Sequence, residues 1–345
     1  MIPSALSEAF AFQGQACVEL GSPFMGQLCR LLSTREWPET SLRERYFAWS
    51  GDIGPNAQSL PLRLAGGFHA LVLTNDPLEQ VYPPNAVEDD VLWRAICDAM
   101  LRQDAFLNDW VDSPPQTNEV RRAAVLIAVG QLLANKFKLP MRVSELGASG
   151  GLNLMFDQFA VKTNGGSFGA TDPSLTLTPE WSGPLPPTAA IDVQQRQGVD
   201  LTPLNPRNQT DAMRLRAYLW PDQPERLTRT NRAIAANDVQ VEQADAIDWL
   251  ANKLDHKAGQ LHLIYHTVAW QYFPDDVQAK GTDLIEQAGK HATVDAPLAW
   301  FGMEADGQSP GAALTLRLWP GEIRLALGRA DFHGRWINWT YKGKK

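Results

Sequence analysis

The sequence predicts an α/β fold, in which a mostly parallel sheet carries helices on both faces, ends in an antiparallel hairpin and is preceded by a helical lobe. Three observations predict it. Residues 1–115 place apolar residues at helical spacing, without competing strand alternation. From residue 116, short apolar strands alternate with helical segments about five times, which favours parallel strands joined by helices. Residues 313–330 alternate apolar and polar residues around a Trp-Pro-Gly-Glu turn, the signal of a hairpin.

The composition is that of a globular protein of more than one domain. The 345 residues are 44% hydrophobic and 20% charged, so a sizeable core can form. The net charge of −8 disfavours a polynucleotide or an anionic membrane as partner. Cys17, Cys29 and Cys97 are odd in number and not closely paired, so we expect reduced thiols. The start lacks a basic region before an apolar run, and we expect a cytoplasmic protein.

The helical lobe is predicted over residues 1–115. Helices are expected at 8–20, 23–33 and 88–111, because each segment repeats apolar residues every three or four positions. Residues 75–85 contain Asn, Asp and Pro and are expected to form a loop.

The second domain is predicted over residues 116–345. It opens with a helix at 118–137, for which Asn118 is a possible cap, followed by a strand at 141–146 and a helix at 152–161. An insertion rich in Gly, Pro, Ser and Thr covers 163–187. The remaining expected strands are 188–201, as one broken strand or a pair, 239–245, 261–270 and 296–304, and the remaining helices are 211–219, 224–237, 246–254 and 282–292.

The segment ELGASGG, residues 145–151, joins the strand at 141–146 to the next helix. Its glycines, Gly147, Gly150 and Gly151, permit a tight turn and close approach of a ligand to the backbone. A helix that begins near Leu152 would direct N–H groups toward that ligand. Glu145, at the strand end, requires a hydrogen-bond donor or a positive charge. The acid favours a ligand with an ammonium and a sulfonium over a pyrophosphate.

Two further acids terminate the next two predicted strands. Asp200 follows Gly198-Val199 and is suited to accept hydrogen bonds from ribose hydroxyls. Asp245 precedes Ala246, and its carboxylate or the adjoining backbone can reach an adenine amino group. Since the carboxyl ends of parallel strands lie at one edge of a sheet, we expect the three acids to surround one crevice.

These residues resemble those of the class I S-adenosylmethionine-dependent methyltransferases, a Rossmann-like fold. More narrowly, ELGASGGLNLMFDQF, WPDQPERL and FHGRWINW resemble a bacterial family known as domain of unknown function 2332. The resemblance implies S-adenosylmethionine or S-adenosylhomocysteine as cofactor. In it the first acid and the glycine loop hold the methionine part, the second acid the ribose and the third the adenine. The implied cofactor residues are Glu145, Gly147, Ser149, Gly150, Gly151, Asn153, Asp200, Asp245 and Ala246.

The sequence departs from the methyltransferase pattern in two places. Ser149 replaces the middle glycine of the loop, where its hydroxyl is able to cap a helix. The insertion at 163–187 lengthens the separation between Glu145 and Asp200.

His266, at the end of the strand at 261–270, is the candidate general base. An imidazole can accept a proton from an oxygen or nitrogen nucleophile during methyl transfer, although a hydrogen-bonded structural histidine is the alternative. The Asn/Asp-Pro-Pro-aromatic motif of amide and base methyltransferases is not found at this strand end. The candidate substrate contacts are His69, Trp270, Tyr272, Glu304 and His333. A packed interior is the alternative for His69 and His333, and a core or interface position is the alternative for Trp270.

The function expected from these features is transfer of a methyl group to an oxygen or nitrogen of a small molecule, with no metal required. A non-catalytic protein that senses S-adenosylmethionine or a nucleoside, or that serves as an interaction module, is the alternative, favoured by Ser149 and by the missing Asn/Asp-Pro-Pro motif. A nicotinamide-dependent oxidoreductase is a third possibility, which the string GASGGL disfavours because its glycines do not follow the G-x-G-x-x-G spacing.

Overall fold

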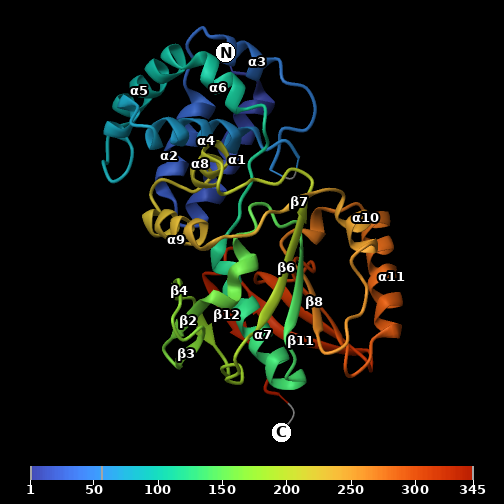
Figure 1. Cartoon of the computed structure of the whole chain (residues 1–345). Coiled ribbons are helices and arrows are strands. Elements are labelled where there is room, and N and C mark those ends of the chain that lie inside the picture. The colour runs from blue at the N-terminus through green and yellow to red at the C-terminus, as the bar shows by residue number, and fades with distance from the viewer. Residues whose placement is uncertain (1, 56, 344–345) are drawn as a thin grey trace. The chain divides into compact units, whose positions relative to one another are not determined.

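The structure is a computed structural model that describes residues 2–55 and 57–343. The chain divides into two compact units (Figure 1). The first comprises the residues up to 117 together with 207–228, and the second comprises 118–206 and the residues from 229 onward. Residues 207–228 are predicted from the sequence to belong to the second domain, whereas in the structure they pack with the N-terminal helices.

The first unit is helical. Its helices are α1 Ser4–Glu19, α2 Pro23–Thr34, α3 Ser41–Phe47, α4 Leu60–Leu73, α5 Asp89–Arg102, α6 Asp104–Trp110 and α8 Gln209–Ala217, with the 3₁₀ turn η1 Pro77–Val81. The helix α8 belongs here because Ala217 and Tyr218 are buried in the same core as α4. Gly66 in α4 allows this packing, since a Cβ at Gly66 would lie 2.4 Å from the Tyr218 ring.

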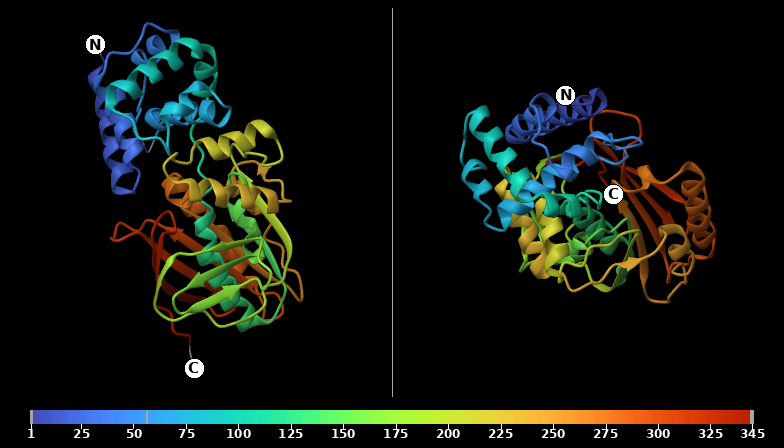
Figure 2. Two further views of the ribbon diagram at one scale, coloured as in Figure 1. Left: turned by 90° about the vertical axis from the view of Figure 1, so that its left-hand side faces the viewer. Right: turned by 90° about the horizontal axis from the view of Figure 1, so that it is seen from above.

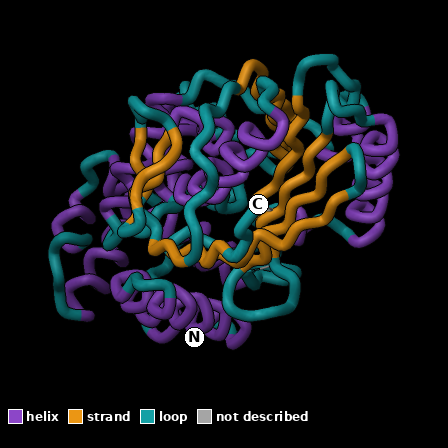
Figure 3. The backbone as a smooth tube through the Cα atoms, turned by 90° about the horizontal axis from the view of Figure 1, so that it is seen from below, coloured by secondary structure: helices purple, strands orange, loops and turns teal. Residues whose placement is uncertain are grey.

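A nine-stranded sheet organises the second unit, in the order β5-β12-β11-β10-β9-β8-β1-β6-β7. Its strands are β1 Met141–Leu146, β5 Glu180–Ser182, β6 Val193–Asp200, β7 Glu242–Gln243, β8 Leu261–Thr267, β9 Leu298–Glu304, β10 Ala312–Trp319, β11 Ile323–Ala330 and β12 Trp336–Trp339. Figure 3 shows the long strands side by side. The predicted mostly parallel sheet and terminal hairpin are confirmed.

The strand order reverses direction at β1. The chain runs from β1 to β6 and β7 on one side, and then returns to β8 and β9 on the other, all in parallel. Such a reversal is the position where open α/β sheets bind ligands, beyond the carboxyl ends of the strands. Glu145 lies at this point, paired with Gly198 of β6 and Tyr265 of β8.

The two faces of the sheet have separate cores. On one face, α7 Ala123–Phe137 packs with Met141, Val143 and Tyr265. On the other face, α10 Ala246–Ala251 and α11 Asp275–His291 pack with Leu146 and Ile264. Alternation along β1 and β8 therefore assigns neighbouring residues to opposite faces, with Glu145 and Tyr265 on the α7 face and His266 on the α11 face.

The predicted helix at 152–161 is wrong for most of its length. Residues Leu152–Gln158 form a 3₁₀ helix, η3, and Phe159–Thr163 form the strand β2. With β3 Gly166–Gly169 and β4 Leu175–Leu177, β2 makes a three-stranded sheet against α7, seen in Figure 2 on the left. The insertion thus supplies ordered strands, because the apolar residues of β2 and β4 cover α7.

Other differences from the predicted elements are smaller. The helix expected at 118–137 begins as a 3₁₀ turn, η2 Val120–Arg122, and Asn118 does not cap α7. The strand expected at 239–245 is reduced to β7, and α9 Pro224–Ala236 spans the sequence division between the units. Within the described residues, no helix has both the length and the apolar character needed to cross a membrane.

Candidate functional site

The carboxyl ends of β1, β6 and β7 bring the three predicted acids to one rim of the sheet. Glu145 is next to last in β1, Asp200 ends β6, and Asp245 follows β7 by two residues. The strands are adjacent and parallel, as β1 pairs with β6 and β6 with β7. Asp200 is close enough to Glu145 for its charge to raise the pKa of Glu145.

The glycine loop follows β1 with a left-handed backbone at alternate residues. The φ angles are +71° at Gly147, +52° at Ser149 and +70° at Gly151. A Cβ on Gly147 would lie 2.6 Å from the Cβ of Ala269, so glycine is required there by contact as well as by conformation. Ser149 adopts the same region in spite of its side chain, a conformation that costs energy in non-glycine residues.

The amide groups of this loop donate to acceptors within the protein. Those of Gly147 and Ala148 both donate to the Val199 carbonyl at 3.0 Å, and that of Ser149 donates to Asp200 Oδ2 at 2.8 Å. The Gly151 amide donates to the Ala148 carbonyl at 2.8 Å. These bonds fix the loop on the end of β6, and they remove the donors that a phosphate would use.

Glu145 is a buried acid, with an exposed fraction of 2%. The Tyr265 hydroxyl donates to its Oε2 at 3.3 Å. Burial raises the pKa of Glu145 to about 8, against the opposing effects of the Tyr265 hydroxyl and the Arg122 guanidinium. A pKa of about 8 favours the protonated form of Glu145 at neutral pH.

Asp200 and Asp245 orient backbone groups while keeping acceptor capacity. Asp200 Oδ2 accepts from Ser149 and its Oδ1 from the Thr202 amide at 2.9 Å. Asp245 Oδ1 caps α10 by accepting from the amides of Ile247 and Asp248. A carboxylate oxygen has two lone pairs, so each of these side chains can accept further hydrogen bonds.

The start of η3 is held by Asn118 instead of facing a ligand. The Leu152 amide donates to Asn118 Oδ1 at 2.9 Å, and the Asn153 side chain, 1% exposed, donates to the Glu119 carbonyl at 3.3 Å. The predicted helix N-terminus is therefore a short 3₁₀ helix whose Leu152 amide already has an acceptor. Asn153 ties the start of this helix to the Glu119 backbone.

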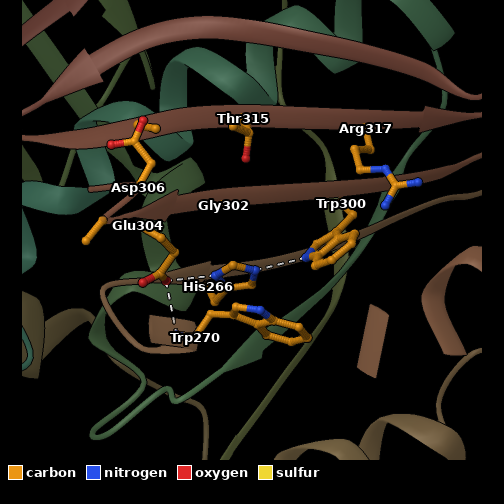
Figure 4. A pocket seen from close by; sticks show the side chains of 10 residues that line it. His266, Trp270, Trp300, Gly302, Glu304, Asp306, Thr315 and Arg317 are labelled. Carbon is orange, nitrogen blue, oxygen red and sulfur yellow. Dashed lines mark hydrogen bonds and ion pairs between the residues drawn. The ribbon is translucent and has the colours of Figure 1, made fainter. Parts of the chain in front are cut away.

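His266 lies in a chain of hydrogen bonds on the α11 face (Figure 4). The Trp300 indole N–H donates to His266 Nε2 at 2.9 Å, so the ring proton is on Nδ1 and is donated to Glu304 Oε1 at 2.8 Å. Glu304 also accepts from the amides of Ala269 and Trp270. Although burial alone would raise the pKa of Glu304, the His266 hydrogen bond and these amides hold it below its ordinary value.

Both nitrogens of His266 are thus engaged, and no free lone pair faces an incoming substrate. Trp270 covers one side of the ring, with centroids 4.9 Å apart and an interplanar angle of 20°. The geometry favours the structural alternative over the predicted general base.

The other predicted substrate residues do not gather at one place. His69 belongs to the first unit, where burial lowers its pKa to about 4 and its Nδ1 donates to the Ala217 carbonyl at 3.1 Å. Tyr272 is 61% exposed. His333 is half-buried after β11, and its amide donates to Asp331. Only Trp270 and Glu304 lie next to His266.

Sequence reasoning did not identify Tyr265, Arg122 or Trp300. The hydrogen bonds of Tyr265 to Glu145 and of Trp300 to His266 depend on the register between neighbouring strands, which no local sequence pattern specifies. Arg122 Nη1 donates to the Thr267 carbonyl and its Nε to the Phe332 carbonyl, so it joins the β8 end to the FHGRW segment. Across the part of the chain that the structure describes, no group of three or more His, Cys, Asp or Glu is arranged to hold a metal.

The chain belongs to the family described as "Uncharacterized protein conserved in bacteria (DUF2332)", which matches residues 7–339. The narrower resemblance seen in the sequence is therefore confirmed. No curated protein and no solved structure matches the chain.

Proposed function

We propose that this member of the DUF2332 family is an S-adenosylmethionine-dependent methyltransferase that acts on an oxygen or nitrogen of a small molecule. The observation that carries the proposal is the placement of Glu145, Asp200 and Asp245 on three adjacent parallel strands, at the reversal of strand order and beside a left-handed glycine loop. Open α/β sheets bind ligands at such a reversal.

The hydrogen bonds of the loop support this cofactor over a dinucleotide. A pyrophosphate needs free backbone amides, yet the amides of Gly147, Ala148 and Ser149 already have protein acceptors. The carboxylates of Asp200 and Asp245 at the rim would also repel phosphate. A ligand with an ammonium and a sulfonium, and without phosphate, suits this donor and acceptor set.

Each acid has a distinct role in the proposal. Glu145 faces the ammonium, and it becomes ionised as that charge displaces its proton. Asp200 uses its remaining lone pairs for the ribose hydroxyls, and Asp245 accepts from the adenine amino group. The bound cofactor would supply an electrophilic methyl group, while the chain contributes alignment of the acceptor with it.

The state of His266 restricts the acceptor. Since both ring nitrogens are bonded, the chain offers no imidazole base at the end of β8. The acceptor in this proposal is therefore a nucleophile that needs no deprotonation before methyl transfer, such as a carboxylate oxygen or an unprotonated nitrogen, and any proton released afterwards goes to solvent. The same observation favours a second candidate, a sensor that binds the cofactor without transferring its methyl group.

Calorimetry with S-adenosylmethionine, S-adenosylhomocysteine and NAD⁺ tests the proposal. Binding of the first two but not the third is expected, and binding of NAD⁺ alone would favour the oxidoreductase. Asp200→Asn should weaken S-adenosylhomocysteine binding by about tenfold, the value of one charge-assisted hydrogen bond. Asp192→Asn, an exposed acid next to the other end of β6, is the matched control and should have no effect.

Transfer of an isotopically labelled methyl group to a metabolite extract separates the enzyme from the sensor. Binding without labelled product favours the sensor. If neither adenosyl compound binds, both candidates fail.

A further inference from the structure

A hollow of about 240 Å³ lies on the α11 face of the large sheet (Figure 4). It is separate from Glu145, whose side chain is on the α7 face. His266 of β8 is paired with Gly302 of β9, and Gly302 is paired with Thr315 of β10. Directly paired residues point to the same side of a sheet, so these three residues share the face that carries the hollow.

The floor of the hollow exists because Gly302 has no side chain. A Cβ at this position would lie 2.9 Å from His266 Cε1 and 3.3 Å from Thr315 Oγ1. Thr315 is exposed, and no hydrogen bond to its hydroxyl is found among residues 2–55 and 57–343. Ala313, the next floor residue, is also small.

One wall of the hollow is aromatic. The rings of His266 and Trp270 are stacked, and Trp300 meets Trp270 edge to face with centroids 5.4 Å apart. The polar atoms of His266 and the Trp300 indole N–H are bonded within the wall. The wall therefore presents ring surface to the space, which suits contact with another flat ring.

The two ends of the hollow carry opposite charge. Glu304 lies at one end and Arg317 at the other, where Arg317 pairs with Trp300 across the strands. Trp300 and Glu304 are four residues apart on β9, a separation of ~13 Å along an extended strand. The ends are thus far enough apart for a ring to lie between them.

Both charged ends retain hydrogen-bonding capacity. Among the residues that the structure describes, Glu304 Oε2 accepts one hydrogen bond, from the Gln271 amide at 3.3 Å. One Nη of Arg317 pairs with Glu286 at 2.7 Å, which leaves several of the five guanidinium donors for another acceptor. Asp306, beside Glu304, forms an ion pair with Arg329, as Arg317 does with Glu286.

We propose that this hollow binds a small zwitterion in which a flat ring separates an ammonium from a carboxylate. The ammonium lies at the Glu304 end, the ring between Gly302 and the aromatic wall, and the carboxylate at the Arg317 end. The inference goes beyond the proposed function, because such binding does not require S-adenosylmethionine and is measured without it.

The probe is 4-(aminomethyl)benzoate, a rigid molecule with these three parts. Three comparison compounds each remove one part: benzylamine lacks the carboxylate, benzoate lacks the ammonium, and trans-4-(aminomethyl)cyclohexanecarboxylate lacks the flat ring. Ligand-observed NMR should show the probe binding with a Kd below about 10 mM and each comparison compound about tenfold weaker. Absence of probe binding, or equal binding of all four compounds, would overturn the proposal.

A matched pair of variants tests the location. Thr176 in β4 is, like Thr315, an exposed strand threonine, but it belongs to the three-stranded sheet. Thr315→Tyr fills the hollow and should weaken the probe about tenfold, whereas Thr176→Tyr adds the same bulk outside it and should change the Kd by less than about twofold. Equal effects of the two variants would refute the site.

Arg317→Gln tests the orientation. It should remove the preference for the probe over benzylamine, while benzylamine itself binds as before. A preference that survives this change would show that the carboxylate does not lie at Arg317, and the proposed zwitterion would be wrong. Circular dichroism confirms that each variant is folded.

Discussion

Glu145→Gln is the perturbation that the structure specifies most sharply. Glutamine has the shape of a protonated glutamate but cannot ionise, so it retains the buried neutral state at every pH. In the unfolded chain Glu145 loses its proton near 4.5, whereas burial raises the pKa in the folded protein to about 8. The folded state therefore holds one more proton on Glu145 than the unfolded state between these values, so the contribution of Glu145 to wild-type stability falls as pH rises through this interval.

The magnitude follows from the width of the interval. At ~1.4 kcal/mol per pH unit, the span from 4.5 to about 8 gives a loss of roughly 5 kcal/mol, an upper limit because the surrounding groups relax around a new carboxylate. The loss is absent below pH 4.5 and complete above about 8. Glu145→Gln should escape it, so its free energy of unfolding should increase relative to the wild type over this range.

The assay is urea denaturation of both proteins at intervals from about pH 5 to about pH 9. Other titrating groups are common to the two proteins and cancel in the difference. Glu322→Gln, at an exposed residue of the same unit, is the control and should follow the wild type. If the curves for Glu145→Gln and the wild type run parallel, Glu145 is not a buried neutral acid and its proposed response to a cation is also refuted.

Three further outcomes are expected. Affinity for S-adenosylhomocysteine should rise by up to about tenfold per pH unit between about pH 6 and about pH 7.5, because the ammonium of the ligand must displace the proton of Glu145. Calorimetry in buffers of different ionisation enthalpy measures the released proton. Gly147→Ala should destabilise by about 2 kcal/mol or more in urea, and by more than Gly259→Ala, since both glycines have positive φ but only Gly147 meets a neighbouring Cβ. Burial lowers the pKa of His262 to about 3, so the contribution of His262 to stability should fall by ~1.4 kcal/mol per pH unit as pH drops from 6.5 toward 3. The free energy of unfolding of wild type minus that of His262→Asn should fall at this rate in urea denaturation, and a difference that does not change with pH would contradict it.

Patterns with a short range predicted most of the fold. The periodic helices, the strand at 141–146 and the hairpin around Trp319 are encoded by neighbouring residues, which is why they were predictable. The structure of residues 152–161 was not predictable in this way. Leu152, Leu154, Met155 and Phe156 are all buried, so apolar content did not distinguish a helix from a 3₁₀ turn leading into a strand.

The candidate site likewise contains residues that the local sequence predicts and residues that it does not. Glu145, Asp200 and Asp245 were predictable because each lies at a strand end that the chain itself marks. The partners of Glu145 and the hollow at Gly302 depend on register between strands far apart in sequence, such as Trp300 opposite Arg317. Register is decided by packing of whole faces, and a one-residue shift would turn each side chain to the other face.

Strand alternation also decides which groups can act together. Tyr265 and His266 are consecutive in β8, yet Tyr265 donates to Glu145 on the α7 face while His266 donates to Glu304 on the α11 face. A proton on Glu145 therefore has no direct route through the sheet to His266, whose own nitrogens are occupied by Trp300 and Glu304. In the proposed function, loss of the Glu145 proton near neutral pH is therefore coupled to a charge that arrives at the rim of the sheet, and the proposed binding at the hollow is independent of that step.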